Sequence, residues 1–438
     1  MQRPVDHSEV LATSRSRFRL LAAAVLGNVC EFFDFTSYAF FAVMIGKAFF
    51  PSDSPYASTL LSLAAFGVGF VARPFGSLLI GRYADRSGRR PALLLTILMM
   101  AGGTLMIAVT PGYETIGFAA PLLIVIARLL QGAALGGELG PATVYLFEVS
   151  SVTTRGIWTS WQPASQGLAT MLAGATGALL ATSLNEEELL QWGWRIPFVL
   201  GMVIVPIGLY LRRNLPETMP LPRREWRPST HSAFGRRPGM KLQIAIFAQI
   251  GFGTISIYLT TYMTTFATQT LGLSPSVAFY SAIVAGLAVF ASSLIGGWAS
   301  DRFSRRIVIA APRCLIVLVA IPMFSAVVSS QDILPLMLLS FALPFLAMIS
   351  GGASFAAMIE ALPVGYRSTG LATAYALVVT LLGGTAQFVV TWLIAATGDG
   401  CVPAYYLIAI GALSTATLPW LQNEGLASAE AAGILQSD

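Results

Sequence analysis

The sequence predicts an all-α polytopic membrane protein with twelve transmembrane helices in two pseudo-symmetric six-helix bundles. The first observation is composition: of the 438 residues 55% are hydrophobic and only 11% are charged, whereas an ordinary soluble domain carries about 25% charged residues. The second is that apolar runs long enough to cross a bilayer recur along nearly the whole chain. The third is a charged motif that occurs twice and predicts two related halves.

The twelve predicted helices divide the chain into two bundles joined by a polar linker. We expect a cytoplasmic N-terminal segment at 1–19, a first bundle at 20–213, a Pro- and Arg-rich linker at 214–240, a second bundle at 241–422 and a cytoplasmic tail at 423–438. The helices are expected at 18–49, 57–80, 91–110, 118–148, 156–182, 193–213, 241–269, 275–299, 307–329, 333–358, 366–396 and 403–422.

The repeated motif reads GRYADRSGRR from Gly81 to Arg90 and GWASDRFSRR from Gly297 to Arg306. A second repeat supports the division, because Glu148 precedes Arg155 by the same interval at which Glu360 precedes Arg367. Parallel halves of this kind are typical of transporters, in which the substrate site lies between the halves near the middle of the membrane. The aligned charged positions of the first repeat are Asp85 with Asp301, Arg86 with Arg302, and Arg89 and Arg90 with Arg305 and Arg306.

Basic residues gather in alternate loops, which sets the expected orientation. The loops opposite to those of the repeated motif hold only Lys47 and Arg195 among several acidic residues. Because short cytoplasmic loops carry the excess of Lys and Arg, both termini and both copies of the motif are predicted to face the cytoplasm, across the cell (inner) membrane. The same rule accounts for the formal net charge of +5, so no nucleic-acid partner is expected.

Several other classes of protein are disfavoured. The cysteines Cys30, Cys314 and Cys401 lie far apart, and the two histidines, His7 and His231, do not accompany them, so neither a disulfide framework nor a metal site is predicted. The polar N-terminal segment runs into a long apolar span without a cleavage site, so no signal peptide is expected. The absence of a nucleophile and base pair argues against an enzyme or a receptor with a catalytic domain, and no cofactor is predicted.

The first helix carries the richest set of polar residues. Asn28, Glu31, Asp34 and Tyr38 recur every three or four residues, which predicts one polar stripe. Counting about 1.5 Å per residue from Arg19 places the two carboxylates on either side of the middle of the bilayer. Two carboxylates in one low-dielectric cavity do not both ionise easily, as a proton carrier requires. The alternative is that they pair with an arginine and hold the bundle together, and which of them carries the proton stays open.

Arginines inside the predicted spans are the candidate anion-binding groups. Arg128 lies near the middle of the fourth helix, where its planar guanidinium matches a carboxylate, either of the substrate or of Glu31 or Asp34. Arg313 lies about 10 Å deep in the ninth helix, and it either compensates a second substrate carboxylate or extends toward the cytoplasmic interface. For Arg73 of the second helix, nearness to the loop favours an interfacial or gating role.

Further polar positions are expected to line the cavity or to serve ordinary helix packing. The role of Glu138 in the fourth helix stays open. The candidates are Gln162, Gln166 and Thr170 on the fifth helix, Ser256, Thr260, Thr264, Tyr258 and Tyr262 on the seventh, and Gln387 on the eleventh.

These motifs resemble the major facilitator superfamily. GRYADRSGRR is similar to that superfamily's loop between helices two and three, and RLLQGAALG, with Arg128, Gly132 and Gly136, is similar to its fourth-helix pattern. The runs RLLQGAALGGELGPATVYLFE, GWRIPF and LPET resemble its metabolite-proton symporter branch, and helices seven and eleven resemble the citrate and tricarballylate members. The second loop copy departs from the signature at Ser304, where the first copy has Gly88.

The resemblance implies a proton-coupled symporter of a small organic anion, most simply a di- or tricarboxylate, that works as a monomer by rocking its two halves. Glu31 and Asp34 would carry the proton, and Arg128, Arg313, Asn28, Tyr38, Gln162, Gln166, Tyr258, Tyr262 and Gln387 would bind the substrate. A monocarboxylate or a zwitterionic osmolyte is the alternative substrate, and it would make Arg313 structural. The resemblance also implies a cytoplasmic gate made of Gly81, Asp85, Arg86, Arg89, Arg90, Glu148, Arg155, Asp301, Arg302, Glu360 and Arg367.

Overall fold

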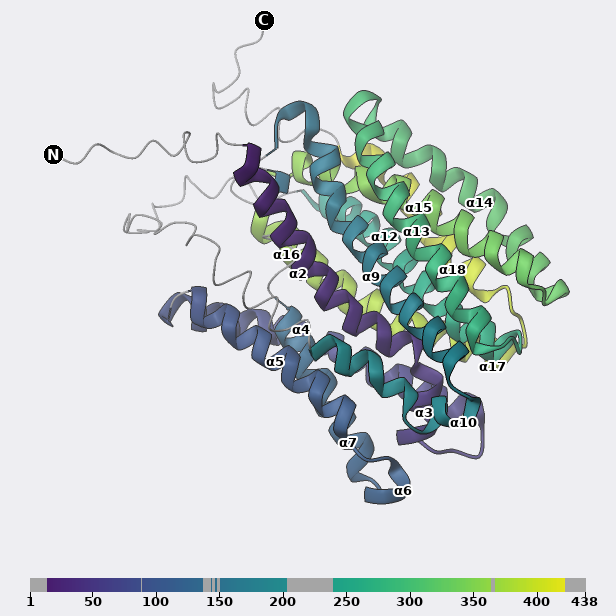
Figure 1. The fold of residues 1–438 in the computed structure, drawn as a ribbon. Coiled ribbons are helices and arrows are strands. Elements are labelled where there is room, and N and C mark those ends of the chain that lie inside the picture. The colour runs from purple at the N-terminus through teal and green to yellow at the C-terminus, as the bar shows by residue number, and fades with distance from the viewer. Residues whose placement is uncertain are drawn as a thin grey trace, which may run out of the picture.

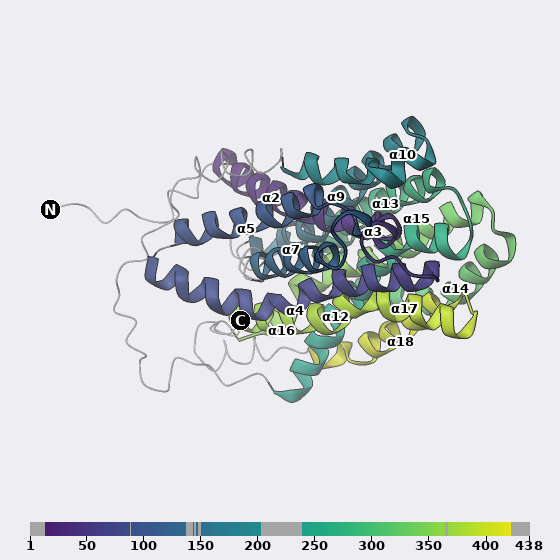
Figure 2. The same cartoon turned by 90° about the horizontal axis from the view of Figure 1, so that it is seen from below.

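A computed structural model gives the fold, and it describes residues 14–87, 89–136, 143, 146–147, 150–202, 239–363 and 367–421. Within these ranges the regular elements are all helices, which run roughly alongside one another (Figures 1 and 2). The prediction of an all-α protein is therefore confirmed.

The first predicted bundle begins with a bent helix. Helix α2 ends at Phe40, and α3 continues after a break at Phe41 with a bend of 64°. The elements of this part are α2 (Ser14–Phe40), α3 (Ala42–Phe49), α4 (Pro55–Ser87), α5 (Arg89–Val109), α6 (Tyr113–Ile116), α7 (Ala119–Leu135), a 3-10 turn (Val152–Thr154), α9 (Arg155–Ser183), α10 (Glu186–Gln191), a second 3-10 turn (Gly193–Arg195) and a helix described at 196–202.

The second predicted bundle begins at Met240, the last position of the predicted linker. Two of its helices contain a π-helical turn, one at the end of α12 and one between α16 and α17. The elements are α12 (Met240–Thr265) with its π-helical turn (Phe266–Thr270), α13 (Pro275–Arg302), α14 (Arg305–Ser330), α15 (Ile333–Ala361), α16 (Arg367–Val378), the second π-helical turn (Val379–Gly383), α17 (Gly384–Thr397), α18 (Val402–Ala416) and a 3-10 turn (Leu418–Leu421).

Each of the twelve ranges predicted from the sequence contains helix, although the sixth is described only as far as residue 202. Among the described residues, six helices are long and apolar enough to cross a membrane, or seven if α2 and α3 form one span. Helices α5, α7 and α18 contribute shorter apolar segments. Helix α9 is long enough but carries many polar residues, including Gln162 and Gln166.

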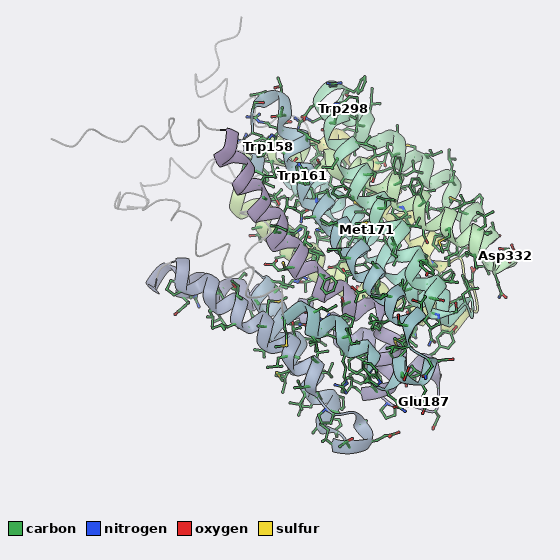
Figure 3. All side chains as sticks on the ribbon, viewed as in Figure 1. Trp158, Trp161, Met171, Glu187, Trp298 and Asp332 are labelled. Atoms are coloured by element: carbon green, nitrogen blue, oxygen red, sulfur yellow. The ribbon has the colours of Figure 1, made fainter. Side chains whose placement is uncertain are left out.

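The helices present two chemically different ends. We call the end at which α9 begins at Arg155 and α13 finishes at Arg302 the basic end, and the opposite one the far end. Figure 3 shows Trp158, Trp161 and Trp298 toward the basic end and Glu187 and Asp332 at the far end. Arg155 and Arg302 thus lie at one end of the helices and Glu187 and Asp332 at the other, as the distribution of charged residues among the loops predicted.

Glycines allow α9 and α13 to touch along their whole length. A methyl group on Gly286 of α13 would lie 2.5 Å from the backbone nitrogen of Met171 and 2.8 Å from the carbonyl oxygen of Gly167, both on α9. Toward the basic end, a methyl group on Gly156 would collide with the carbonyl oxygen of Gly297. This glycine seam joins the two predicted bundles by direct backbone approach, as is common between membrane helices.

A second contact between the predicted bundles lies between α4 and α17. The Thr380 hydroxyl, in the π-helical turn before α17, donates to the carbonyl oxygen of Phe70 at 3.0 Å, and a methyl group on Gly67 would collide with the carbonyl oxygen of Gly384. At the far end, the Tyr56 hydroxyl donates to the carbonyl oxygen of Gln269 at 3.3 Å. The two predicted bundles are thus packed together on two sides.

Part of the predicted gate lies outside this description. Glu148, and Glu138 whose role was left open, fall outside the described residues. The structure places Gly81, Asp85 and Arg86 in α4 and Arg89 and Arg90 at the start of α5, but it does not describe their side chains.

Candidate functional site

Four charged side chains are buried in the described part of the chain, and three of them are arginines. Arg73, Arg128 and Arg313 are 4%, 1% and 0% exposed, and Asp34 is 4% exposed. A charge removed from water is costly unless a partner compensates it. The described part of the interior therefore has an excess of buried positive charge that an anion would relieve.

Asp34 and Arg128 are linked through the amide of Gln131. The Nη1 atom of Arg128 donates to Oε1 of Gln131 at 2.6 Å, and Nε2 of Gln131 donates to Oδ2 of Asp34 at 2.5 Å. The same Nε2 lies 3.0 Å from the Thr104 hydroxyl of α5. This network joins α2, α5 and α7 and places one of the two predicted proton carriers beside the predicted anion-binding arginine.

The guanidinium of Arg128 stacks on aromatic rings and keeps one edge unpaired. Its Cζ atom lies 4.1 Å from the ring centroid of Tyr38, 4.8 Å from that of Phe66 and 4.9 Å from that of Phe35. Its Nε and Nη2 atoms are buried and have no hydrogen-bond partner among the described residues. These two atoms form the edge with which arginine binds a carboxylate through two parallel hydrogen bonds.

Arg73 is not interfacial but lies in the interior, which corrects the expectation from its distance to the loop. Its Cζ atom lies 4.3 Å from the Phe70 ring centroid and 5.3 Å from that of Phe35, which Arg128 also contacts. Its Nε atom is buried without a partner in the described chain. The sequence signal that points to it is its place within the apolar span of α4; the direction of the side chain depends on the aromatic cluster formed by other helices.

Arg313 is held by neutral groups in the interior, and it does not extend to the interface. It donates to Oε1 of Gln249 at 2.5 Å, to the Ser354 hydroxyl at 2.9 Å and to the Ser350 hydroxyl at 3.1 Å. Its Cζ atom also lies 4.3 Å from the Phe252 ring centroid. Hydroxyls and amides satisfy its N–H groups but do not neutralise its charge.

A central cavity lies between the two predicted bundles. Its empty volume is about 530 Å³. Gln162 presents an amide to this cavity whose oxygen and nitrogen are both buried and unpartnered within the described residues. The walls come from α2, α9, α12, α15 and α16, and the polar lining residues are Gln162, Gln166, Gln249, Thr254, Tyr258, Ser354 and Tyr375.

The central cavity borders two of the buried arginines through its walls. Tyr258 and Tyr375 line it and lie next to Arg73, and Gln249 and Ser354 line it and bind Arg313. The sequence analysis missed Gln131, Gln249 and Tyr375 because neutral polar residues are common in membrane helices. These three residues can be recognised as part of the candidate site only from the charged residues beside which they lie.

The polar residues that were expected to form one stripe on the first helix contact several different neighbouring helices. Asn28 faces α9, where it donates to the Ser165 hydroxyl at 2.5 Å and to the carbonyl oxygen of Gln162 at 3.2 Å. Tyr38 is buried beside Arg128, and its hydroxyl donates to the carbonyl oxygen of Ser62 on α4 at 3.2 Å. Glu31 is partly exposed. Asn28, Asp34 and Tyr38 therefore contact different neighbouring helices.

The remaining predicted lining residues have mixed positions. Gln387 donates to the Thr261 hydroxyl at 2.8 Å and to the carbonyl oxygen of Tyr258 at 3.2 Å, and Tyr262 is buried outside the central cavity. Ser256 and Thr260 line a separate, mostly apolar cavity with an empty volume of about 360 Å³ within the second bundle. Thr170 and Thr264 bond to carbonyl oxygens of their own helices.

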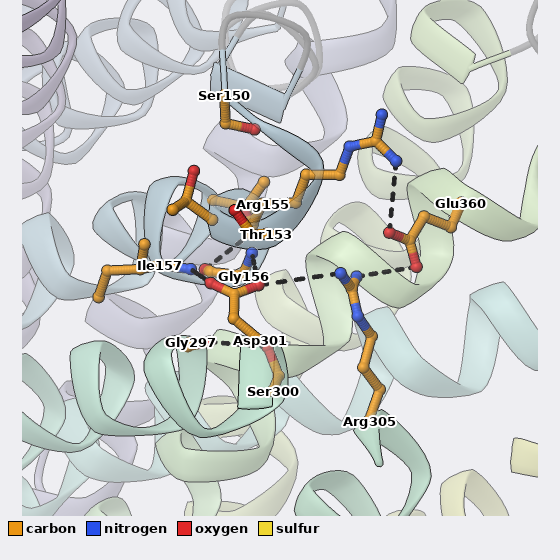
Figure 4. Close-up of polar contacts among 12 residues, drawn as sticks. Ser150, Thr153, Arg155, Gly156, Ile157, Gly297, Ser300, Asp301, Arg305 and Glu360 are labelled. Atoms are coloured by element: carbon orange, nitrogen blue, oxygen red, sulfur yellow. Dashed lines mark hydrogen bonds and ion pairs between the residues drawn. The ribbon is translucent and has the colours of Figure 1, made fainter. Parts of the chain in front are cut away.

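At the basic end, Asp301 of α13 caps the N-terminus of α9. Its Oδ1 accepts the backbone N–H of Gly156 at 2.7 Å, and its Oδ2 accepts that of Ile157 at 2.9 Å (Figure 4). A helix N-terminus offers unpaired N–H groups and a positive partial charge, which a carboxylate satisfies. Asp301, from one copy of the repeated motif, thereby links the two predicted bundles at the basic end.

Glu360 adds charged contacts to this link. Its Oε2 lies 2.9 Å from Nη1 of Arg305, and its Oε1 lies 3.8 Å from Nη1 of Arg155 on the other bundle (Figure 4). Two other predicted gate residues lie nearby: Arg367 donates to the carbonyl oxygen of Leu362 at 3.3 Å and interacts electrostatically with Glu360, and Arg302 stacks on Trp298.

Two sets of membrane helices that meet around a shared cavity, with buried charges behind its walls and charged contacts at one end, are typical of membrane transporters. The family model described as Major Facilitator Superfamily matches residues 24–386. The chain belongs to this superfamily. It is accordingly a transporter and not an enzyme.

Two curated relatives and one solved structure illustrate the likeness. The chain is 36% identical to the citrate-proton symporter of Salmonella typhi over 425 residues, 96% of this chain and 98% of that one. It is also 36% identical to the citrate-proton symporter of Klebsiella pneumoniae over 417 residues, 92% of this chain and 94% of that one. A crystal structure of a D-xylose-proton symporter matches with a TM-score of 0.73 at 18% identity, covering 92% of this chain and 97% of that chain.

Proposed function

We propose that this protein is a proton-coupled symporter that carries a small organic anion, a di- or tricarboxylate such as citrate or tricarballylate, by alternating access. The observation that carries the proposal is the buried charge: the described residues include three buried arginines and one buried carboxylate, and the Nε and Nη2 edge of Arg128 is unpaired in the described chain. The names of the two citrate-proton symporters that resemble the chain along nearly their whole lengths support the same substrate class.

Arg128 is the group proposed to hold one substrate carboxylate. Arg73 and Arg313 lie behind the walls of the central cavity and lower the cost of bringing further carboxylates out of water. A substrate with one carboxylate would leave this excess charge largely uncompensated, which favours the di- or tricarboxylate over a zwitterion.

Asp34 is proposed as the proton carrier. Its Oδ1 is buried without a partner among the described residues, so a proton can be added there without breaking a hydrogen bond. Protonation removes the negative charge that competes with the substrate for Arg128, so proton and anion favour each other's binding. The proton gradient then drives uptake, and no cofactor is needed.

The gate is proposed to work at the basic end. The protein is proposed to be a monomer in the inner membrane, with its basic end facing the cytoplasm. The closure by Asp301 and Glu360 would open and close as the bundles 20–213 and 241–422 rock against each other. The first copy of the motif, with Asp85, is proposed to act in the same way. Enzyme fusions at each terminus, active only in the cytoplasm, test the orientation.

The decisive experiment is uptake into proteoliposomes under an imposed pH gradient. Citrate, tricarballylate and C4-dicarboxylates are expected to accumulate when the outside is acidic, with acidification of the lumen, whereas betaine is not. Asp34→Asn is expected to bind citrate but not to concentrate it. The proposal fails if none of these anions moves with protons, or if Asp34→Asn still concentrates citrate as the unmodified protein does.

A further inference from the structure

Gln131 is the one described side chain that bonds both to Asp34 and to Arg128. It is 1% exposed, and it lies three residues after Arg128, on the same face of α7. Its two amide atoms contact different partners: Oε1 faces Arg128 at 2.6 Å, and Nε2 faces Asp34 at 2.5 Å and Thr104 at 3.0 Å. No ion pair joins Asp34 directly to Arg128 in the described chain.

The partners of Gln131 fix the direction of its amide. Arginine has only donors, so the amide oxygen must face Arg128. The Thr104 hydroxyl donates its hydrogen to the carbonyl oxygen of Met100 at 3.0 Å, so it can only accept from Nε2. Gly103 also confines the side chain, because a methyl group there would lie 2.6 Å from Cγ of Gln131.

This orientation leaves unpaired hydrogen-bonding atoms on both sides of the amide: Oδ1 of Asp34 on one side, and Nε and Nη2 of Arg128 on the other. Asp34 can take a proton on Oδ1 while Oδ2 continues to accept from Gln131, and Arg128 can take a carboxylate on Nε and Nη2 while Nη1 continues to donate to Gln131. If the carboxylate and the guanidinium met directly, each would satisfy the other, and these atoms would no longer be unpaired.

We infer that Gln131 is the positioning residue that couples protonation of Asp34 to anion binding at Arg128, by keeping the two charges close but not in contact. The inference rests on the proposed function. With Asp34 ionised, its charge partly compensates Arg128 across the amide. With the proton from solvent on Oδ1, Arg128 is uncompensated and attracts the substrate carboxylate, and the substrate in turn holds the proton until both leave.

Few other groups face this pair. Arg128 is the one charged side chain that faces Asp34 among the described residues, while α5 presents Thr104 and the helix at 196–202 presents Gly201. On its own helix, Arg128 is followed by Gln131, while α2 presents Tyr38, α4 presents Arg73 and α12 presents Tyr258. Asp34 is thus the one carboxylate beside Arg128 among the described residues. The pH dependence of anion binding is therefore governed by Asp34.

The test is the slope of log Kd for radiolabelled citrate against pH, measured on the purified full-length protein. In the unmodified protein one linked proton makes log Kd rise by up to about one per pH unit. In Gln131→Met, Arg128 can reach Asp34 directly, so the ionised carboxylate competes with citrate for the guanidinium. Citrate is expected to bind at least about tenfold more weakly than to the unmodified protein at neutral pH, to regain affinity as the pH falls, and to keep a steep slope down to a lower pH.

Gln131→Glu is expected to add a second ionisable competitor for Arg128. A protonated glutamic acid offers one donor and one acceptor as the amide does, whereas an ionised one pairs with Arg128 and blocks the substrate. Binding in Gln131→Glu should therefore approach that of the unmodified protein at acidic pH and fall more steeply as pH rises. Ionisation of citrate itself affects all variants alike and cancels in the comparison.

The control is Gln191→Met, which removes an exposed amide of α10 and should keep the unmodified slope. The inference is overturned if Gln131→Met and Gln131→Glu keep the unmodified slope, or if each shifts Kd by one constant factor at every pH, as a merely structural residue would. Should Gln131→Met fail to fold, Gln131→Glu decides alone. If the unmodified protein binds neither citrate nor tricarballylate nor a C4-dicarboxylate at any pH, the proposed function itself is wrong.

Discussion

Asp301→Asn should open the basic end of the transporter. In the structure both carboxylate oxygens of Asp301 accept backbone N–H groups at the start of α9, and the side chain is 7% exposed. An asparagine keeps one accepting oxygen, but it turns an NH₂ group toward the second N–H. The closed arrangement then loses a charge, gains an unsatisfied donor and is weakened relative to the open one.

The size of the shift from closed to open molecules can be estimated from the contacts that Asp301→Asn removes. Leaving a buried backbone N–H unsatisfied costs about 1–3 kcal/mol, and removing a carboxylate from a partly buried helix N-terminus costs about 0.5–2 kcal/mol. Because these contributions overlap, we expect a total of about 2–4 kcal/mol, which changes the ratio of closed to open molecules about 30- to 700-fold.

Distances between spin labels on the two bundles measure this ratio. Val152, before α9, and Phe303, after α13, are 70% and 62% exposed and suit labelling through cysteines. The labels need a background in which three native cysteines are replaced by serine, namely Cys30, Cys314 and Cys401. Asp301→Asn is expected to move the distance distribution toward longer values.

The matched control is Asp332→Asn, which changes an exposed acid that precedes α15 at the far end and makes no capping hydrogen bond with its side chain. It should leave the distribution unchanged. If Asp301→Asn also leaves the short distance as populated as before, the contacts of Asp301 do not hold the basic end closed, and the gating interpretation must be abandoned.

Three further substitutions test other parts of the structure. Arg128→Lys keeps the charge but loses the two-bond edge, so calorimetry should show citrate binding at least about tenfold weaker, and unchanged affinity would remove Arg128 from the substrate site. Arg73→Met replaces a buried cation by an apolar chain, so the ligand-free protein should melt about 2 °C higher or more while citrate stabilises it less; a lower melting temperature with full citrate stabilisation would contradict this. Gly286→Ala should cost about 1–3 kcal/mol by forcing α9 and α13 apart, whereas Gly102→Ala, with no neighbour within 4 Å, should not lower the melting temperature.

The sequence was sufficient for the helices and for singling out Asp301 at the contact between the predicted bundles, because both leave periodic or repeated signals. Long apolar runs placed helix in all twelve ranges, and the repeated motif pointed to Asp301. The bend at Phe41 was not predictable, since neither proline nor glycine marks it. The division into two rocking bundles and the roles of the site residues remain predictions.

The arrangement of the interior depended on helix rotation, which counting along the chain cannot give. Depth alone suggested an interfacial Arg73, but the aromatic rings of α2 and α4 surround it. Spacing alone grouped Asn28 with Asp34, yet they face α9 and α7. A neutral residue such as Gln131 carries no signal until its partners are known.

The glycine seam has a consequence for how the protein is made. Helix α9 is not among the described helices that are apolar enough to cross a membrane by themselves. Its glycine face packs on α13, and its glutamines Gln162 and Gln166 face the central cavity, whose other walls include α12, α15 and α16; all of these helices follow α9 in the sequence. During synthesis α9 must therefore emerge before the surface that shelters it exists. We expect a chain cut at residue 213 to insert this helix inefficiently, and the second half, supplied as a separate polypeptide, to rescue its insertion.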